Sequence, residues 1–387
     1  MKRNALKQNI PIMYAITFFQ GIVLYASIST LFRQARGLTL AEFAIIDGFS
    51  YIFQLAFEIP FGMLADRIGY KRTLVFSNGI YLLSKIVFWQ AYAFRTFLLE
   101  RLLFSIALAG LSGVDSSILF LSAGEEDSQK AFSHASAFGT AGMLTGSLIF
   151  TLFLSHNYDA SAFGTVIAYS IAFVLSFFII DVKEDMPKER TPSLRCLTGI
   201  LRITLKDYRF LLFILAEALL SYATWAISVM LSQTKYISLG LTTTHIGWIE
   251  IAFSVLAMTG AWSAVLTKKM GFRKFMVTGF VVIAASSLVM GMTGSILVAI
   301  VSVALVEITY ALLSPLVSDL YSKHVTVADR ATQLSVYAMV TEFFSFIISL
   351  TMSFVTAQSY FASFLLCALM ALAGIFLFLI CYRNSKT

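Results

Sequence analysis

The chain alternates between long apolar runs and short polar stretches from one end to the other. Twelve apolar runs, each about 20 residues long, are bounded by charged or turn-forming residues. Because a helix rises about 1.5 Å per residue, each run can cross about 30 Å of hydrocarbon. Lipid cannot satisfy open backbone groups, so we expect every run to be helical and the fold class to be all-α. The runs fall at residues 11–32, 42–64, 74–93, 96–121, 134–154, 162–182, 210–232, 244–266, 275–293, 295–321, 332–356 and 360–382.

One polar connection is much longer than the others and divides the runs into two sets of six. It covers residues 183–209. The sequence therefore predicts a six-helix bundle over 1–182, a linker over 183–209, and a second six-helix bundle over 210–387. The second part of the linker places basic residues on one helical face and leucines on another, which predicts an amphipathic helix on the anionic inner leaflet.

Composition supports a polytopic membrane protein and excludes a soluble domain. Of 387 residues, 58% are hydrophobic and only 13% are charged, so a soluble fold would have too little interior for its apolar surface. The net charge of +7 does not indicate nucleic-acid binding, because the basic residues cluster on one predicted side. With the N-terminus inside, 22 lysines and arginines fall in inner segments and 4 in outer segments, so we predict two cytoplasmic termini.

No residue pattern indicates a cofactor or a metal. The three cysteines, Cys196, Cys367 and Cys381, lack metal-ligand spacing. A membrane-embedded enzyme is the alternative from another class, and its best candidate is the acidic segment 124–130. That segment is short and lacks a repeat, and no nucleotide-binding loop is present, so we expect no enzymatic activity.

A short loop sequence occurs twice, once in each half. The segment GMLADRIGYKR at 62–72 aligns with AVLTKKMGFRK at 264–274, an offset of 202 residues. Both copies fall between the second and third runs of their half. Parallel repeats of this kind are typical of transporters that bind substrate between two bundles.

The first copy resembles the loop signature of the major facilitator superfamily. The lead-in Glu58, Pro60 and Gly62 is similar to that of a poorly characterised bacterial branch. The resemblance covers essentially the whole chain. It implies a multi-pass transporter that works by alternating access and lies in the cell membrane, which in a bacterium is the inner membrane. The residues that match the signature are Gly62, Leu64, Asp66, Arg67, Gly69, Lys71 and Arg72, with Tyr70 in place of the usual arginine.

This loop is predicted to be a conformational latch. Asp66 can cap the exposed N–H groups of a helix end, and the resemblance points to the helix that begins near Arg330. Gly62 permits a close helix approach and Gly69 a tight turn. Glu58 is interpreted as part of the inner gate rather than as a substrate ligand. The predicted latch consists of Gly62, Asp66, Arg67, Gly69, Lys71 and Arg72.

Ionisable residues inside the spans are candidates for coupling and substrate binding, because each is costly to insert. The resemblance implies that the first, fourth, seventh and tenth spans line the cavity. Glu307 is nearest mid-membrane, so we expect it either to exchange the coupling proton or to be a satisfied structural carboxylate. Glu100 and Asp319 lie near span ends and are expected to be solvated. The candidates for the cavity and for coupling are Glu307, Asp115, Arg101 and Glu217.

The fifth run carries GTAGMLTG, in which Gly142 and Gly146 suit close helix packing while Met143 replaces the proline of the family's antiporter motif. The abundant aromatic residues favour proton-coupled export of a small amphipathic or hydrophobic compound. Proton-linked uptake of a small metabolite is the alternative. The expected partners are a small-molecule substrate, protons and membrane lipids, and we expect a monomer.

Overall fold

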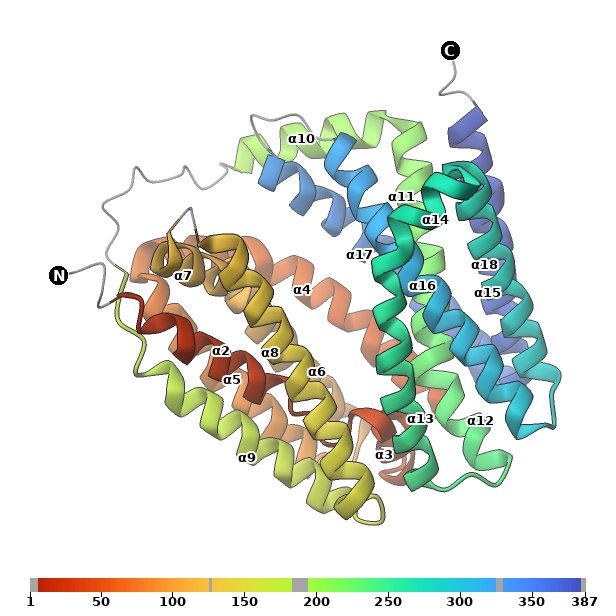
Figure 1. Ribbon diagram of the computed structural model, residues 1–387, viewed down its shortest axis with the longest axis horizontal. Helices are drawn as coiled ribbons and strands as arrows, with labels where there is room; N and C mark the ends of the chain where they lie inside the picture. Colours follow the sequence, from red (N-terminus) through yellow and green to blue (C-terminus); the bar gives the residue numbers. More distant parts are fainter. Residues whose placement is uncertain (1–5, 125–126, 183–193, 325–329, 384–387) are drawn as a thin grey trace. The chain divides into compact units, whose positions relative to one another are not determined.

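The computed structural model describes residues 6–124, 127–182, 194–324 and 330–383 (Figure 1). Every regular element in these ranges is helical. Asp66 and Gly62 are described only as positions in a helix, and the Arg330 side chain lies outside the described residues. The predicted helical class is therefore confirmed for the described part of the chain.

Eight α-helices are described in the N-terminal half. The expected first span is interrupted after its middle, because residues 22–28 leave the α-helical conformation. The helices are α2 (Asn9–Gly21), α3 (Ser29–Ala35), α4 (Leu40–Ile68), α5 (Tyr70–Gln90), α6 (Phe94–Leu111), α7 (Val114–Ala123), α8 (Ser128–Ile149) and α9 (Tyr158–Ser176).

Nine α-helices are described in the C-terminal half, and the first of them lies in the predicted linker. A π-helical segment separates α11 from α12, and a 3-10 segment separates α13 from α14. The helices are α10 (Leu194–Lys206), α11 (Tyr208–Trp225), α12 (Ser232–Ser238), α13 (Thr243–Leu256), α14 (Ser263–Met270), α15 (Phe272–Met292), α16 (Ile296–His324), α17 (Arg330–Gln358) and α18 (Tyr360–Arg383).

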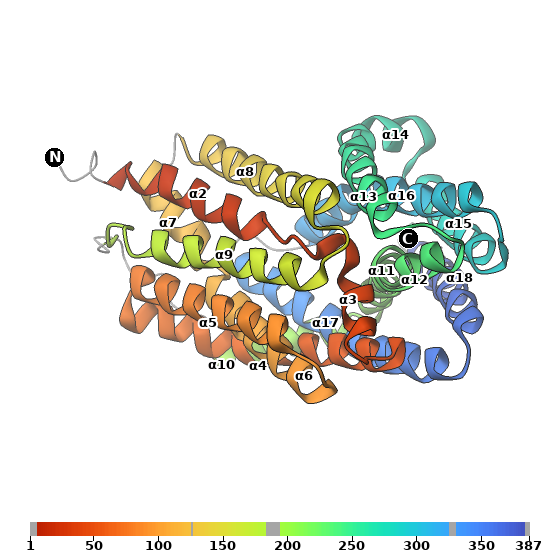
Figure 2. The same ribbon diagram turned by 90° about the horizontal axis from the view of Figure 1, so that it is seen from below.

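The chain falls into two compact units. The first consists of Met1–Leu38, Phe49–Thr191 and Thr243–Trp248, and the second of the remaining residues. Within the first unit, α2 packs on α8 and α9, while α5 packs on α6 and α9 (Figure 2). Within the second unit, α18 packs on α11 and α15, and α16 packs on α15.

Eleven helical stretches among the described residues are long and apolar enough to cross a membrane. They coincide with eleven of the twelve predicted runs. The other run, 74–93, is helical as α5, but polar residues such as Asn78, Ser84 and Lys85 dilute its apolar character. That α5 is a twelfth span stays a prediction.

The expected span 96–121 is not one continuous helix. It divides into α6 and α7 at Ser112 and Gly113, where Gly113 has φ of 77°. A positive φ suits glycine because it has no Cβ. Arg101 on α6 and Asp115 on α7 therefore lie on two separate helices.

The repeated loops have the same backbone feature in both halves. Gly69 lies between α4 and α5 with φ of 90°, and Gly271 lies between α14 and α15 with φ of 78°. These two glycines are aligned in the 202-residue repeat. Each loop turns sharply at a position where a residue with a Cβ would be strained.

Close packing of α8 on α2 depends on small residues. A Cβ atom at Gly142 would overlap the carbonyl oxygen of Phe18, and one at Gly146 would lie 3.3 Å from the Val23 nitrogen. The helices therefore approach until backbone meets backbone, as is typical of membrane helix pairs with glycine at the contact.

Candidate functional site

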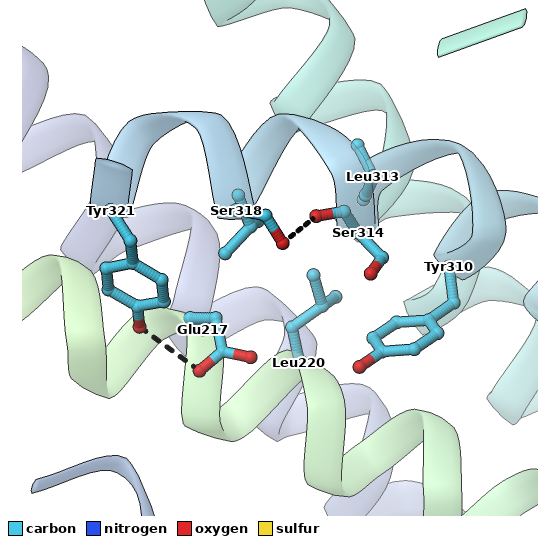
Figure 3. A pocket seen from close by; sticks show the side chains of 8 residues that line it. Glu217, Leu220, Tyr310, Leu313, Ser314, Ser318 and Tyr321 are labelled. Atoms are coloured by element: carbon cyan, nitrogen blue, oxygen red, sulfur yellow. Dashed lines mark hydrogen bonds between the residues drawn. The ribbon is translucent and has the colours of Figure 1, made fainter. Parts of the chain in front are cut away.

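A pocket of about 200 Å³ opens between α11 and α16 in the second unit (Figure 3). Its α16 side chains recur at intervals of three or four residues, so they share one helical face. Glu217 and Leu220 complete the lining from α11. The α16 residues are Tyr310, Leu313, Ser314, Val317, Ser318 and Tyr321.

Glu217 is the one carboxylate that lines this pocket. The Tyr321 hydroxyl donates a hydrogen bond to its Oε2 at 3.3 Å. Ser221, one helical turn further along α11, interacts with both Glu217 and the Tyr310 hydroxyl. The carboxylate is therefore tied to both helices, while the pocket has hydroxyl groups at either end (Figure 3).

Aromatic packing fixes the Tyr321 ring. Phe210 and Phe213 contact it edge-on, with ring centroids 5.9 and 5.6 Å away, and Tyr337 lies at 6.0 Å. Asp207 caps the start of α11 by accepting a hydrogen bond from the Phe210 nitrogen at 3.1 Å. The cap and the ring cluster hold the hydroxyl of Tyr321 toward Glu217.

Glu307, the predicted proton carrier, is half-buried and lies close to a second carboxylate, Glu250. Both are within electrostatic reach of Tyr236, whose side chain is fully buried and whose hydroxyl has no hydrogen-bond partner among the described residues. Tyr310 is within electrostatic reach of Glu217 and Glu307. Tyr310 therefore connects Glu307 with the pocket, because it lines the pocket and is within electrostatic reach of Glu307.

A second polar cluster, the Lys85 cage, lies in the first unit. The Lys85 ammonium is 5% exposed and donates a hydrogen bond to the Tyr25 hydroxyl at 3.2 Å. Ring centroids of Tyr25, Tyr81, Phe104 and Tyr169 lie 4.9–5.8 Å from its nitrogen. Cation–π attraction is strongest where water is excluded, so these rings stabilise the buried charge.

Glu100 is buried beside the Lys85 cage, whereas the sequence predicted that it would be solvated. It is 1% exposed, and its Oε2 has no hydrogen-bond partner among the described residues. It interacts electrostatically with Lys85, although the two form no direct ion pair. The expectation was wrong because neighbouring helices, rather than lipid headgroups, cover this end of α6. Asp319, by contrast, is exposed.

The remaining candidates occupy separate places. Arg101 lies on α6 with its guanidinium 5.2 Å from the Phe104 ring centroid. Asp115 is in the first turn of α7, and its buried Oδ1 has no hydrogen-bond partner among the described residues. Both residues belong to the first unit, whereas Glu217 and Glu307 belong to the second.

The predicted latch surrounds the turn between α4 and α5. Arg67 is exposed in the last turn of α4, and Arg72 is exposed in the first turn of α5, where Lys71 is half-buried. Glu58 is half-buried on α4. The Asp66 side chain lies outside the described residues, so the cap stays a prediction.

In the described part of the chain, no group of three histidine, cysteine or acidic side chains could hold a metal ion. The cysteines with described side chains, Cys367 and Cys381, are not part of a disulfide bond.

A helical membrane protein with two related halves and an acidic pocket between helices has the architecture of a secondary transporter. The family model of the Major Facilitator Superfamily matches residues 11–216 and 213–387, so the chain belongs to this superfamily. A comparison with curated protein sequences finds no significant match.

Solved structures share the fold at low sequence identity. The nucleoside transporter NupG is 15% identical with a TM-score of 0.79, over 97% of this chain and 100% of that one. A bacterial homolog of the human lysosomal transporter Spinster is 12% identical with a TM-score of 0.72, over 99% and 96%. A D-xylose-proton symporter is 15% identical with a TM-score of 0.68, over 96% of each chain. The identity of the superfamily is confirmed, and these likenesses show the fold.

Sequence reasoning found Glu217 but missed its surroundings. The recurrence of Tyr310, Ser314 and Tyr321 on one face of α16 was the available signal. Three partners of Lys85 were also missed, since Tyr25, Phe104 and Tyr169 come from other segments of the chain, whereas Tyr81 lies one turn before Lys85 on α5.

Proposed function

We propose that this chain is a proton-coupled secondary transporter that exports a small amphipathic molecule by alternating access. The observation that carries the proposal is the Glu217 pocket, in which a membrane-embedded carboxylate and four hydroxyl groups line a space beside aliphatic side chains. Polar groups of this kind orient a ligand, while Leu220, Leu313 and Val317 suit its apolar part.

Coupling requires a group whose protonation differs between the two facing states. Glu307 is suited to this role because it is half-buried and shares Tyr310 as a neighbour with the pocket carboxylate. Loss or gain of a proton at Glu307 changes the field at Tyr310 and thereby at the substrate.

The test of coupling is Glu307→Gln in proteoliposomes with an imposed pH gradient. Glutamine keeps the shape and hydrogen bonding of the protonated acid, so substrate binding and exchange should persist while gradient-driven accumulation is lost. The matched control is Asp319→Asn, an exposed carboxylate on the same helix. If Glu307→Gln still responds to the pH gradient, Glu307 is not the coupling site and Asp115 would be tested next.

Proton-linked uptake of a small metabolite is the second candidate, because hydroxyl groups of Tyr310, Ser314, Ser318 and Tyr321 suit a polar solute. A structural neighbour is named a D-xylose-proton symporter. The direction of transport is tested in the same proteoliposomes. If the chain is a proton antiporter, an acidic lumen should drive substrate into the liposomes in exchange for protons. If it is a proton symporter, an acidic external medium should drive substrate in together with protons.

We further propose the latch role for Asp66, Arg67, Lys71 and Arg72. Support comes from their match to the family signature and from the sharp turn at Gly69. In this proposal, the basic side chains donate hydrogen bonds to carbonyl and carboxylate groups that become accessible when the inner side closes.

A further inference from the structure

The Glu217 pocket contains an acidic side chain but no basic side chain. Of its eight lining residues, Glu217 alone carries a carboxyl group. Glu217 also forms no ion pair with any residue in the described ranges. A carboxylate inside a membrane helix bundle is costly without an opposite charge, and such groups pair with one another or mark a ligand pathway.

The size of the pocket limits the ligand part that fits. A volume of about 200 Å³ exceeds the roughly 30 Å³ of a water molecule. It is below the roughly 300–1,000 Å³ of a pocket that encloses a whole drug-sized ligand. The pocket therefore suits a head group with a few carbon atoms, and the rest of the molecule would extend from it.

The lining chemistry favours an organic cation over a bare metal ion. Hard metal ions take several oxygen ligands, usually including more than one carboxylate. Here one carboxylate is accompanied by the aliphatic side chains of Leu220, Leu313 and Val317. Those carbons would leave a metal ion without ligands but would contact the methylene groups of an amine.

The Glu217 carboxylate interacts with the Tyr321 and Ser221 hydroxyls and can still accept from a further donor, because its two oxygens offer about four lone-pair sites. Tyr321 donates to Oε2 of Glu217, and the other oxygen points toward the Tyr310 side of the pocket (Figure 3). An ammonium N–H group can donate to this oxygen, and a charge-assisted bond of this kind is stronger than a neutral one. Tyr310 and Tyr321 line the two ends of the pocket, where an aromatic ring can attract a cation.

We propose that the Glu217 pocket is a head-group subsite for a protonated organic amine, with Glu217 as counter-ion and Tyr310 and Tyr321 as flanking rings. The proposal refines the substrate class of the transporter proposed above. It also predicts equilibrium binding without any gradient, which can be measured independently of transport.

The test compares three probes that share a phenylethyl tail and differ in charge: phenethylamine, 2-phenylethanol and 3-phenylpropanoate. Binding to the purified full-length chain in lipid nanodiscs is measured by calorimetry at neutral pH. We expect the amine to bind tightly and the alcohol to bind at least about tenfold more weakly, because the alcohol makes only a neutral hydrogen bond to Glu217. We expect no binding of the carboxylate, because its negative charge is repelled by Glu217.

Glu217→Gln should weaken amine binding by about tenfold or more and should leave alcohol binding nearly unchanged. Asp319→Asn, the exposed carboxylate on α16, should bind the amine like the unmodified chain. Tyr310→Leu keeps the carboxylate but removes one ring, so it should weaken amine binding severalfold. It also serves if Glu217→Gln fails to fold.

Equal affinity for amine and alcohol, tighter binding of the carboxylate, or unchanged amine binding in Glu217→Gln would each overturn the proposal. Absence of binding by all three probes would overturn it as well. If the amine binds as expected but no pH gradient drives its transport, the amine subsite stands and the proposed transport function fails.

Discussion

At the scale of single residues, burial depends on neighbours that the sequence does not display. Glu100 lies near the end of its apolar run, and hydrophobic patterning alone places it at the membrane surface. Its 1% exposure results from packing of α6 against α5, which brings it beside Lys85. Sequence reasoning did identify Glu217 and Glu307 as membrane-embedded acids, because an ionisable residue within an apolar run is conspicuous by itself.

The Lys85 cage and Glu100 should be energetically coupled. Lys85→Met preserves approximate volume but leaves the buried Glu100 without that cation, so it should lower the unfolding temperature in detergent. Glu100→Gln should also destabilise the chain, because it leaves Lys85 without its nearby anion. The double substitution removes both charges and should cost less than the sum, with a coupling energy of about 0.5–3 kcal/mol.

The control pair for this cycle is Lys85→Met with Asp127→Asn, because Asp127 is exposed at the start of α8. These two changes should add. Strict additivity of Lys85→Met and Glu100→Gln would show that the two groups do not stabilise each other.

At the scale of helices, the sequence predicts where apolar segments lie better than where they break. The run 96–121 looks continuous because Ser112 and Gly113 are both small and compatible with a membrane. The structure ends α6 at Leu111 and starts α7 at Val114, with Gly113 in a positive-φ conformation. Hydrophobicity contains no information about such a break, whereas glycine permits it without requiring it.

Packing of α2 on α8 yields a prediction at the same scale. Gly142→Ala should destabilise the chain by about 1–3 kcal/mol, because the added methyl group meets the Phe18 backbone carbonyl and the helices must separate. Thermal unfolding in detergent measures the change. Gly199→Ala is the control, since no atom lies within 4 Å of a Cβ there and α10 gains helix propensity. An unchanged unfolding temperature for Gly142→Ala would contradict the close packing described here.

At the scale of the whole molecule, the superfamily could be predicted from the repeat and the family signature, whereas the pocket could not be predicted from the sequence. The aligned Gly69 and Gly271 show that the repeat extends to backbone conformation. The pocket depends on the rotation of α11 and α16 about their axes, which brings Glu217 beside Tyr321 across 104 residues of sequence. Apolar periodicity does not determine that rotation, because lipid and neighbouring helices both accept apolar faces.

The predicted latch concerns the conformational state of the whole molecule. Asp66→Asn keeps the size of the side chain but removes the charge on which a helix cap of this kind depends. The inward-open population should therefore rise, and a cysteine at the pocket position, Ser318→Cys, should react severalfold faster with a polar thiol reagent applied from the cytoplasmic side. The three native cysteines are replaced by alanine in this background. Asp127→Asn, an exposed acid outside the loop, should leave the rate unchanged. If Asp66→Asn alters neither the reaction rate nor transport, Asp66 is a solvated loop residue. The signature at 62–72 would then stabilise the turn but not the inward-closed conformation.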